Sequence, residues 1–206
     1  MKIFLLLPLL IQFLFSSAQK VFVEKRDQHE RTSISIAIKL PDTIRYYGVN
    51  CGFEDVAILP DSAKIKLMNE LLSFLSDTSE CYIPVYNLTN HYMGKKFPVS
   101  KKFNVQVEAL VYITYLGLSS RAFVYCPFPV LYDKEEKKEI TKFSPELDEI
   151  IRFYRTWVKE ITKKGFFNYS LPLHGTRYEW FGSLMDNLTF EKYPLWEKYY
   201  DCPAVD

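Results

Sequence analysis

Apolar residues recur at intervals of three and four over residues 144–165, which is the spacing of one helix face. Ser144 suits the N-cap of such a helix, and Pro145 suits its first turn because that position has no backbone hydrogen bond to lose. Lysines precede Gly165, a residue typical of a helix C-terminus. The pattern predicts an amphipathic helix between these signals.

Two further stretches have the same periodicity. One begins at Asp61 or Ser62 and ends near Asp77, with a leucine-rich stripe on one face. The other covers residues 102–116. Glycine is scarce, at 7 of 206 residues, which disfavours folds rich in tight hairpins. We therefore predict a mainly α fold of antiparallel helical hairpins.

Three segments depart from helical spacing. Residues 122–132 contain Pro127 and Pro129, and two prolines this close together favour an extended backbone. Residues 33–39 alternate Ser-Ile-Ser-Ile-Ala-Ile-Lys, which has the period of a strand. That strand would make the fold α+β, the alternative to the mainly α prediction. Residues 133–142 are almost wholly charged, and we expect a solvated loop there.

Two short motifs resemble the HEAT family of helical repeats. Residues 42–49 read D-T-I-R-Y-Y-G-V and residues 105–110 read V-Q-V-E-A-L. Both are similar to the V-R-x-x-A-A pattern with which the second helix of a HEAT repeat begins, although Gln106 stands where the family has arginine. Their separation matches neither one repeat nor two. The resemblance implies stacked, HEAT-like hairpins, with an irregular helical bundle as the alternative.

The first eighteen residues have the character of a secretory signal peptide. Lys2 precedes an apolar stretch over residues 3–15 that is too short to cross a bilayer, and Ser-Ser-Ala then supplies small residues for signal peptidase. We expect residues 1–18 to be removed, with cleavage before Gln19. Residues 19–206 would then form a single globular domain, exported to the periplasm or the extracellular space, with no transmembrane segment.

Four cysteines, Cys51, Cys81, Cys126 and Cys202, are candidates for disulfide formation, because an exported chain meets an oxidising environment. Their spacing contains no C-x-x-C, so neither a zinc knuckle nor a thioredoxin-like redox pair is indicated. Three pairings are open. Buried free thiols are the alternative.

Three N-x-S/T triplets begin at Asn87, Asn168 and Asn187. They accept glycans only in a eukaryotic secretory pathway. The style of the signal peptide favours a bacterial protein, so the triplets are not taken as evidence of glycosylation.

The charge balance narrows the classes of partner. The chain has 26 basic and 25 acidic residues, and Lys2 is the one charged residue of the signal, so residues 19–206 are formally neutral. Neutrality disfavours nucleic-acid binding. Hydrophobic residues make up 48% and aromatic residues 17%, which excludes low-complexity disorder. The aromatic side chains either fill the core or, where exposed, stack on a sugar or anchor a protein interface.

The sequence carries no established motif of catalysis or metal binding. His29, His91 and His174 are its histidines, none has a second histidine four residues on, and H-E-x-x-H does not occur. The nucleophile elbow G-x-S-x-G and the glycine-rich phosphate loops are also missing from the sequence. We therefore expect no metal and no cofactor.

We predict a non-catalytic binding or scaffold protein of the cell envelope or the secreted space. Its partner would be another protein or an envelope component. The candidate contact residues are Arg45, Tyr46 and Tyr47, combined with Trp180 or Trp196.

The alternative is a secreted hydrolase, directed at glycans, with no recognisable sequence motif. Its site would combine residues that are close in space and not in sequence. A cleft that holds His91 or His174 together with a carboxylate or Cys126 would favour this alternative.

Overall fold

The computed structural model describes residues 20–28, 31–39, 42–47, 56, 58–88, 97–166 and 171–183. Its elements follow one another in this order: β1 (Lys20–Gln28), β2 (Arg31–Lys39), β3 (Ile44–Tyr47), α3 (Asp61–Leu71), the 3₁₀ helix η1 (Leu72–Ser76), α4 (Val105–Leu118), the 3₁₀ helix η2 (Ser119–Arg121), α5 (Ala122–Tyr125), β4 (Leu131–Asp133), β5 (Lys138–Ile140), α6 (Pro145–Lys164) and β6 (Tyr178–Trp180). The predicted signal peptide lies outside the described residues.

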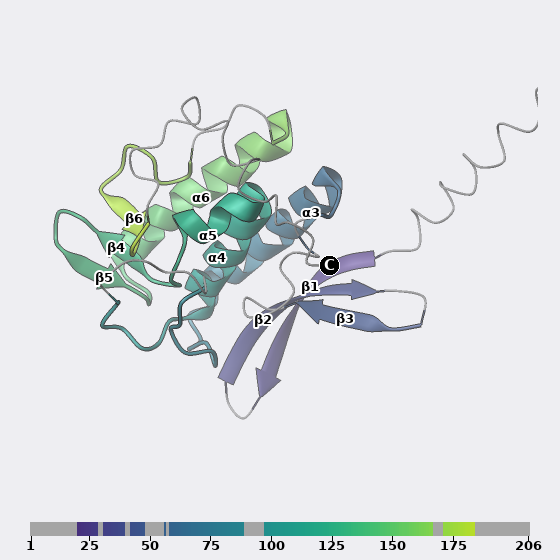
Figure 1. Ribbon diagram of the computed structural model, residues 1–206, viewed down its shortest axis with the longest axis horizontal. Helices are drawn as coiled ribbons and strands as arrows, with labels where there is room; N and C mark the ends of the chain where they lie inside the picture. Colours follow the sequence, from purple (N-terminus) through teal and green to yellow (C-terminus); the bar gives the residue numbers. More distant parts are fainter. Residues whose placement is uncertain are drawn as a thin grey trace, which may run out of the picture.

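Two small antiparallel sheets flank a group of helices (Figure 1). The first sheet has the order β1-β2-β3, and the second has the order β5-β4-β6. Helix α4 lies between the two sheets, and α3 and α6 run alongside it (Figure 1). Buried side chains from both sheets and from these helices belong to one hydrophobic core.

Helix α4 is buried on every side, and all 14 of its residues belong to the interior of the protein. Its N-terminus is capped by Asn104, whose side chain accepts a hydrogen bond from Val107 N at 3.0 Å. Gln106 donates to the carbonyl of Leu75 at 2.8 Å. A helix in the core must satisfy its polar groups inside the protein, and these bonds do so for its first turn.

The next turn of α4 bonds to the backbone of β2. Glu108 accepts hydrogen bonds from Ile34 N at 2.9 Å and from Ser33 Oγ at 2.8 Å, and Tyr112 donates to the carbonyl of Ile34 at 2.8 Å. Glu108 and Tyr112 are one helical turn apart, so they satisfy both peptide groups of a single strand residue. The buried helix and the first sheet are thereby held in a fixed register.

Side chains of helix α3 likewise bond to backbone groups on the free edge of β1. Lys66 Nζ donates to the carbonyl of Val21 at 2.8 Å, and Glu70 accepts from Val23 N at 2.9 Å. Lys66 and Glu70 also form an ion pair at 3.5 Å. Side chains that occupy an edge strand's peptide groups protect it from pairing with other chains.

A close contact joins α4 to α6. A Cβ atom added at Gly117 would clash with the Trp157 ring, so only glycine leaves room for this indole. The ring of Trp157 packs at 5.9 Å from that of Tyr154, which is fully buried. Gly117 therefore sets how closely the two helices approach.

The structure contradicts the mainly α prediction and shows an α+β fold. The strand expected from the alternation of residues 33–39 is β2, so the alternative fold class was the correct one. Residues 42–49, which resemble the start of a HEAT helix, instead contain β3, whose Ile44–Tyr47 pair with residues 36–39 of β2. This segment is rich in β-branched and aromatic side chains, and pairing with β2 overrides the local resemblance. The HEAT-like prediction is therefore wrong.

The three predicted helices are confirmed. Helix α6 has Ser144 as its N-cap, with Leu147 N donating to Ser144 Oγ, and it ends at Gly165, which has a φ of 77°. Residues 61–77 form α3 followed by η1, and residues 102–116 contain most of α4. The segment predicted as extended begins with α5 and becomes a strand only at β4. The charged segment 133–142, expected to be a solvated loop, contains an exposed turn at residues 134–137 and then strand β5.

We predict that Glu108 makes the stability of the fold depend on pH. Burial raises the pKa of Glu108 to about 7, and the hydrogen bonds from Ile34 N and Ser33 offset this only in part. Between the ordinary pKa of a glutamate and pH 7 the native protein holds a proton that the unfolded chain releases. The free energy of unfolding should therefore fall by about 2–3 kcal/mol between pH 5 and pH 8.

Urea unfolding of the wild type and of Glu108→Gln across this pH range measures the effect. Glutamine keeps the size of the side chain; its oxygen can accept from Ile34 N, and its NH2 group can donate to Ser33 Oγ, which reverses that bond. The difference in pH dependence between the two proteins then separates the carboxyl group from the histidines. The pH dependence should be weaker in Glu108→Gln. An identical dependence in both proteins would contradict the assignment.

Candidate functional site

A cavity of about 270 Å³ lies between the segment 171–179, the end of α5 and the start of the β4–β5 turn. Its lining is Tyr125, Lys134, Leu171, Leu173, His174, Gly175, Thr176, Tyr178 and Glu179. The cavity is at the small end of the range for ligand sites, so it has room for one compact ligand.

Local hydrogen bonds shape the segment that carries most of this lining. His174 N donates to the carbonyl of Leu171 at 3.1 Å, and Thr176 N donates to that of Leu173 at 3.1 Å. Gly175 has a φ of 74°, a conformation that favours glycine. These two turns present His174 and Thr176 at the cavity.

The segment is also tied to two other parts of the chain. Leu173 N donates to the hydroxyl of Tyr125 at 3.3 Å, and Lys134 N donates to the carbonyl of Arg177 at 2.9 Å. Strand β6 then pairs with β4, with Tyr178 opposite Asp133. The cavity walls are therefore anchored to secondary structure on both sides.

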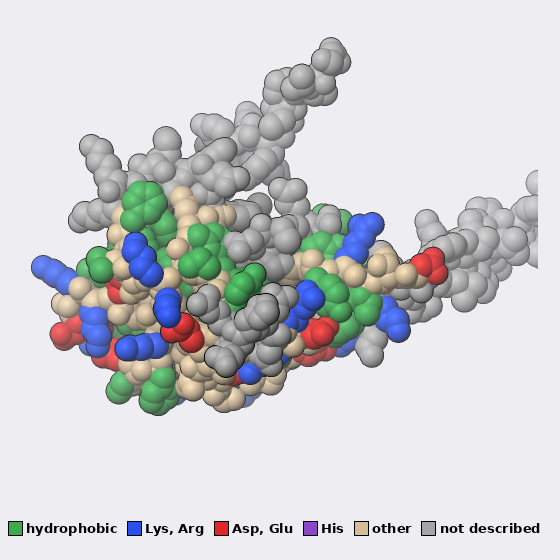
Figure 2. Space-filling view, turned by 90° about the horizontal axis from the view of Figure 1, so that it is seen from below, with side chains coloured by type: hydrophobic (Ala, Val, Ile, Leu, Met, Phe, Trp, Pro, Cys, Tyr) green, Lys and Arg blue, Asp and Glu red, His purple; other side chains and the backbone are tan. Residues whose placement is uncertain are grey.

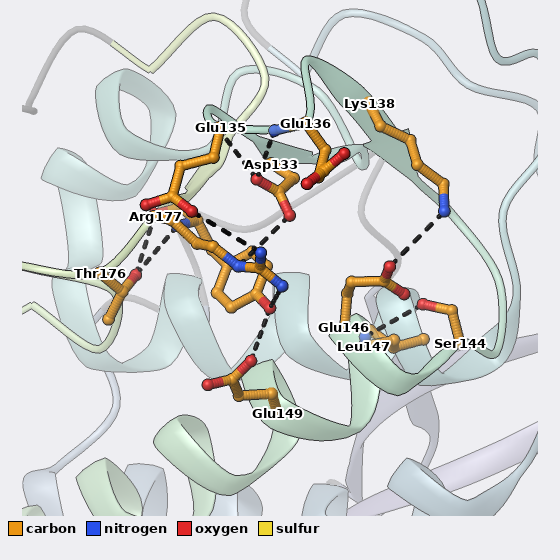
Figure 3. A network of polar contacts seen from close by, with 11 residues as sticks. Asp133, Glu135, Glu136, Lys138, Ser144, Glu146, Leu147, Glu149, Thr176 and Arg177 are labelled. Carbon is orange, nitrogen blue, oxygen red and sulfur yellow. Dashed lines mark hydrogen bonds and ion pairs between the residues drawn. The ribbon is translucent and has the colours of Figure 1, made fainter.

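Arg177 joins the hairpin to the segment and to α6 (Figure 3). Its guanidinium lies 3.4 Å from Asp133 Oδ2 and 3.7 Å from Glu135 Oε2, and it donates to the hydroxyl of Tyr178 at 2.8 Å. Tyr178 in turn donates to Glu149 Oε2 on α6 at 2.6 Å. Asp133 is fully buried, so Arg177 balances a charge that would otherwise be costly.

The lining combines charged and hydroxyl groups with an apolar base. Lys134 and His174 are exposed, Thr176 and Glu179 are half-buried, and the leucines beneath them are buried. An imidazole, an ammonium, a carboxylate and a hydroxyl can donate and accept hydrogen bonds in several directions. An imidazole and a carboxylate at one cavity can also transfer protons.

The predicted contact residues do not come together. Arg45 and Tyr46 are exposed on β3, where Arg26 lies 4.4 Å from the Tyr46 ring centroid, but Tyr47 is buried in the core. Trp180 is in the second sheet and is fully buried, so its prediction as a surface anchor is wrong. Trp196 lies outside the described residues.

The indole of Trp180 belongs to a buried network. Its Nε1 donates to the Tyr154 hydroxyl at 2.8 Å, and that hydroxyl also bonds to Thr114 Oγ1 at 2.7 Å. An indole N–H must find an acceptor when it is buried, and Tyr154 provides one. Trp180 therefore links β6 to α6 and α4.

The disulfide prediction is wrong for the two cysteines that the structure describes. Cys81 and Cys126 are buried free thiols. Cys126 Sγ donates to the carbonyl of Phe128 at 3.5 Å, and burial raises the pKa of Cys126 well above its ordinary value. This thiol is unsuited to be a nucleophile, which requires the thiolate. Cys51 and Cys202 lie outside the described residues.

His174 is the one predicted histidine whose surroundings are described, since His29 and His91 lie outside the described residues. Asn87 is half-buried, and Asn168 and Asn187 also lie outside. In the described part of the chain, no three His, Cys, Asp or Glu side chains come together as a metal site. Sequence reasoning missed Lys134, Thr176 and Glu179; the Gly-Thr pair after His174 was the available sign of a turn there.

We predict that Trp180 contributes to the stability of the fold and not to a contact surface. Trp180→Ala should lower the free energy of unfolding by about 3–5 kcal/mol, because it removes a fully buried indole. Tyr46→Ala should lower it by less than about 1 kcal/mol, since this ring is 37% exposed. Chemical denaturation of both variants measures the difference. Equal effects would contradict the burial described for the two residues.

Comparison with known proteins assigns no family. No protein-family model, no curated protein and no solved structure matches this chain. Among the described residues, none of the helices has both the length and the apolar character that crossing a bilayer requires.

Proposed function

We propose that this protein is an exported binding protein that takes a compact, sugar-like ligand in the cavity beside His174. The observation that carries the proposal is the composition of one small, anchored cavity, in which four different polar side chains surround two leucines. Export rests on the apolar N-terminal segment and its small-residue cleavage site. The ligand would be a glycan component of the cell envelope or of the secreted space.

The polar lining supports a ligand with many hydroxyl groups. The cavity offers both donors and acceptors, from Lys134, His174, Thr176 and Glu179. A hydroxyl donates and accepts at once, so a mixed lining suits it better than it suits an anion or a cation alone. The positive charge of Lys134 and the negative charge of Glu179 cancel, which also favours a neutral ligand.

The apolar base supports the same class of ligand. Leu171 and Leu173 are 6% and 4% exposed. A sugar ring has polar edges and less polar C–H faces, so it can place hydroxyls against the rim and one C–H face toward the small apolar surface that the leucines leave open.

We expect His174→Ala and Glu179→Gln each to weaken binding of the best glycan ligand about tenfold, the loss for one hydrogen bond to a polar or charged group. His174 is exposed, so its replacement should leave thermal stability unchanged. A glycan array with the wild-type protein identifies the ligand, and calorimetric titration then measures the variants.

Glu160→Gln is the matched control, because Glu160 is a half-buried glutamate on α6 outside the cavity lining. It should bind like the wild type. Equal affinities for all four proteins, or no glycan bound by any of them, would refute the proposal.

One observation favours a second candidate, a secreted glycan hydrolase. His174 and Glu179 line the same cavity, and an imidazole with a carboxylate is a general acid–base pair that could activate water. Cys126 would have no part in this chemistry, since its pKa is raised by burial.

Mass spectrometry of glycans after incubation with the protein separates the two candidates. Shortened glycans that are lost with His174→Gln and with Glu179→Gln would support the hydrolase. Glycans that are bound and recovered intact would support the binding protein.

A further inference from the structure

An open groove lies where the end of η1, the N-terminal turn of α4 and the start of α6 meet. It encloses about 710 Å³, and its walls include Leu75, Phe143, Ile151, Arg152 and Arg155. None of its lining residues lines the cavity beside His174. The groove is therefore independent of the proposed function.

One part of the groove is apolar. Leu75 and Ile151 form a buried base, with 2% and 6% of their surface exposed. Phe143, just ahead of the N-cap of α6, is 59% exposed and adds an aromatic ring to the wall. A large ring left this exposed beside a buried apolar base is typical of a contact with another protein.

The other part of the groove is positively charged. Arg152 and Arg155 are exposed and lie three positions apart, so they are neighbours on the surface of α6. Within the described part of the chain, no ion pair or side-chain hydrogen bond engages either guanidinium. Asp148 is the one carboxylate in the lining, which leaves an excess of one positive charge.

The surface outside the groove carries charges of both signs. Figure 2 shows acidic and basic side chains interspersed over the face that it presents, without a field of one sign. Several basic residues elsewhere on the described surface form ion pairs, for example Lys25 with Asp77 at 2.6 Å and Lys102 with Glu80 at 2.7 Å. Arginine pairs are well suited to carboxylates because each guanidinium can bind both oxygens.

We propose that this groove docks an acidic segment of a partner protein, which places an apolar side chain beside Phe143 and carboxylates on Arg152 and Arg155. Charge complementarity identifies the sign of the partner, and the exposed ring of Phe143, 59% accessible, favours a peptide that carries an apolar side chain. An acidic polysaccharide would also satisfy the arginines, so it is the competing ligand that the experiment must exclude.

Fluorescence polarisation with residues 19–206 tests the proposal. The probe is a fluorescein-labelled peptide with a central Leu-Phe pair flanked by glutamates, and its counterpart has lysines in place of the glutamates. The acidic peptide should bind saturably, and more weakly as salt is raised. The double variant Arg152→Glu with Arg155→Glu should weaken binding at least about tenfold, and Phe143→Ala should weaken it several-fold.

The control variant is Lys159→Glu with Lys163→Glu, which makes the same change of charge on the same helix but outside the groove. It should bind the acidic peptide like the wild type. Three outcomes would overturn the proposal: no saturable binding, an equal loss in both double variants, or binding of an acidic oligosaccharide but not of the peptide. All the replaced side chains are exposed, so thermal denaturation should show folded variants.

Discussion

The backbone N–H and C=O groups of Ile34 in β2 bond to side chains of helix α4 and not to a neighbouring strand. The rest of the fold depends on this contact between helix and sheet. Glu108 and Tyr112 supply the acceptor and the donor, one turn apart on the buried helix α4. A buried carboxyl group is costly unless it is bonded, so α4 is stable only in the register that meets β2. Both sheets and the flanking helices then pack around α4.

The second sheet is joined to α4 indirectly, through Tyr154 of α6. Tyr154 bonds to Thr114 of α4 and to the indole of Trp180, which fixes β6 against α6. Arg177 then links the β4–β5 hairpin to Tyr178, and so to α6. The cavity beside His174 lies on this framework, which explains how a segment of turns can hold polar side chains in fixed positions for a ligand.

Sequence patterns correctly predicted the elements whose position is set by local interactions. The cap at Ser144 and the glycine at 165 gave both ends of α6, and the alternation of residues 33–39 indicated a strand. The β-branched and aromatic side chains of β3 suit a strand, but its short motif also resembles the start of a helix, and pairing with β2 decides between the two. The burial of Trp180 likewise depends on Tyr154, which is distant in sequence.

The cavity could not be predicted, because its lining comes from α5, the β4–β5 hairpin and the segment 171–179. The most direct test of its role is a titration of ¹⁵N-labelled residues 19–206 with neutral oligosaccharides, followed by amide chemical shifts. We expect saturable shifts at His174, Thr176 and Glu179 and at Lys134, with the amides of β3 unchanged. No saturable shift at the cavity, or shifts centred on β3, would contradict the account.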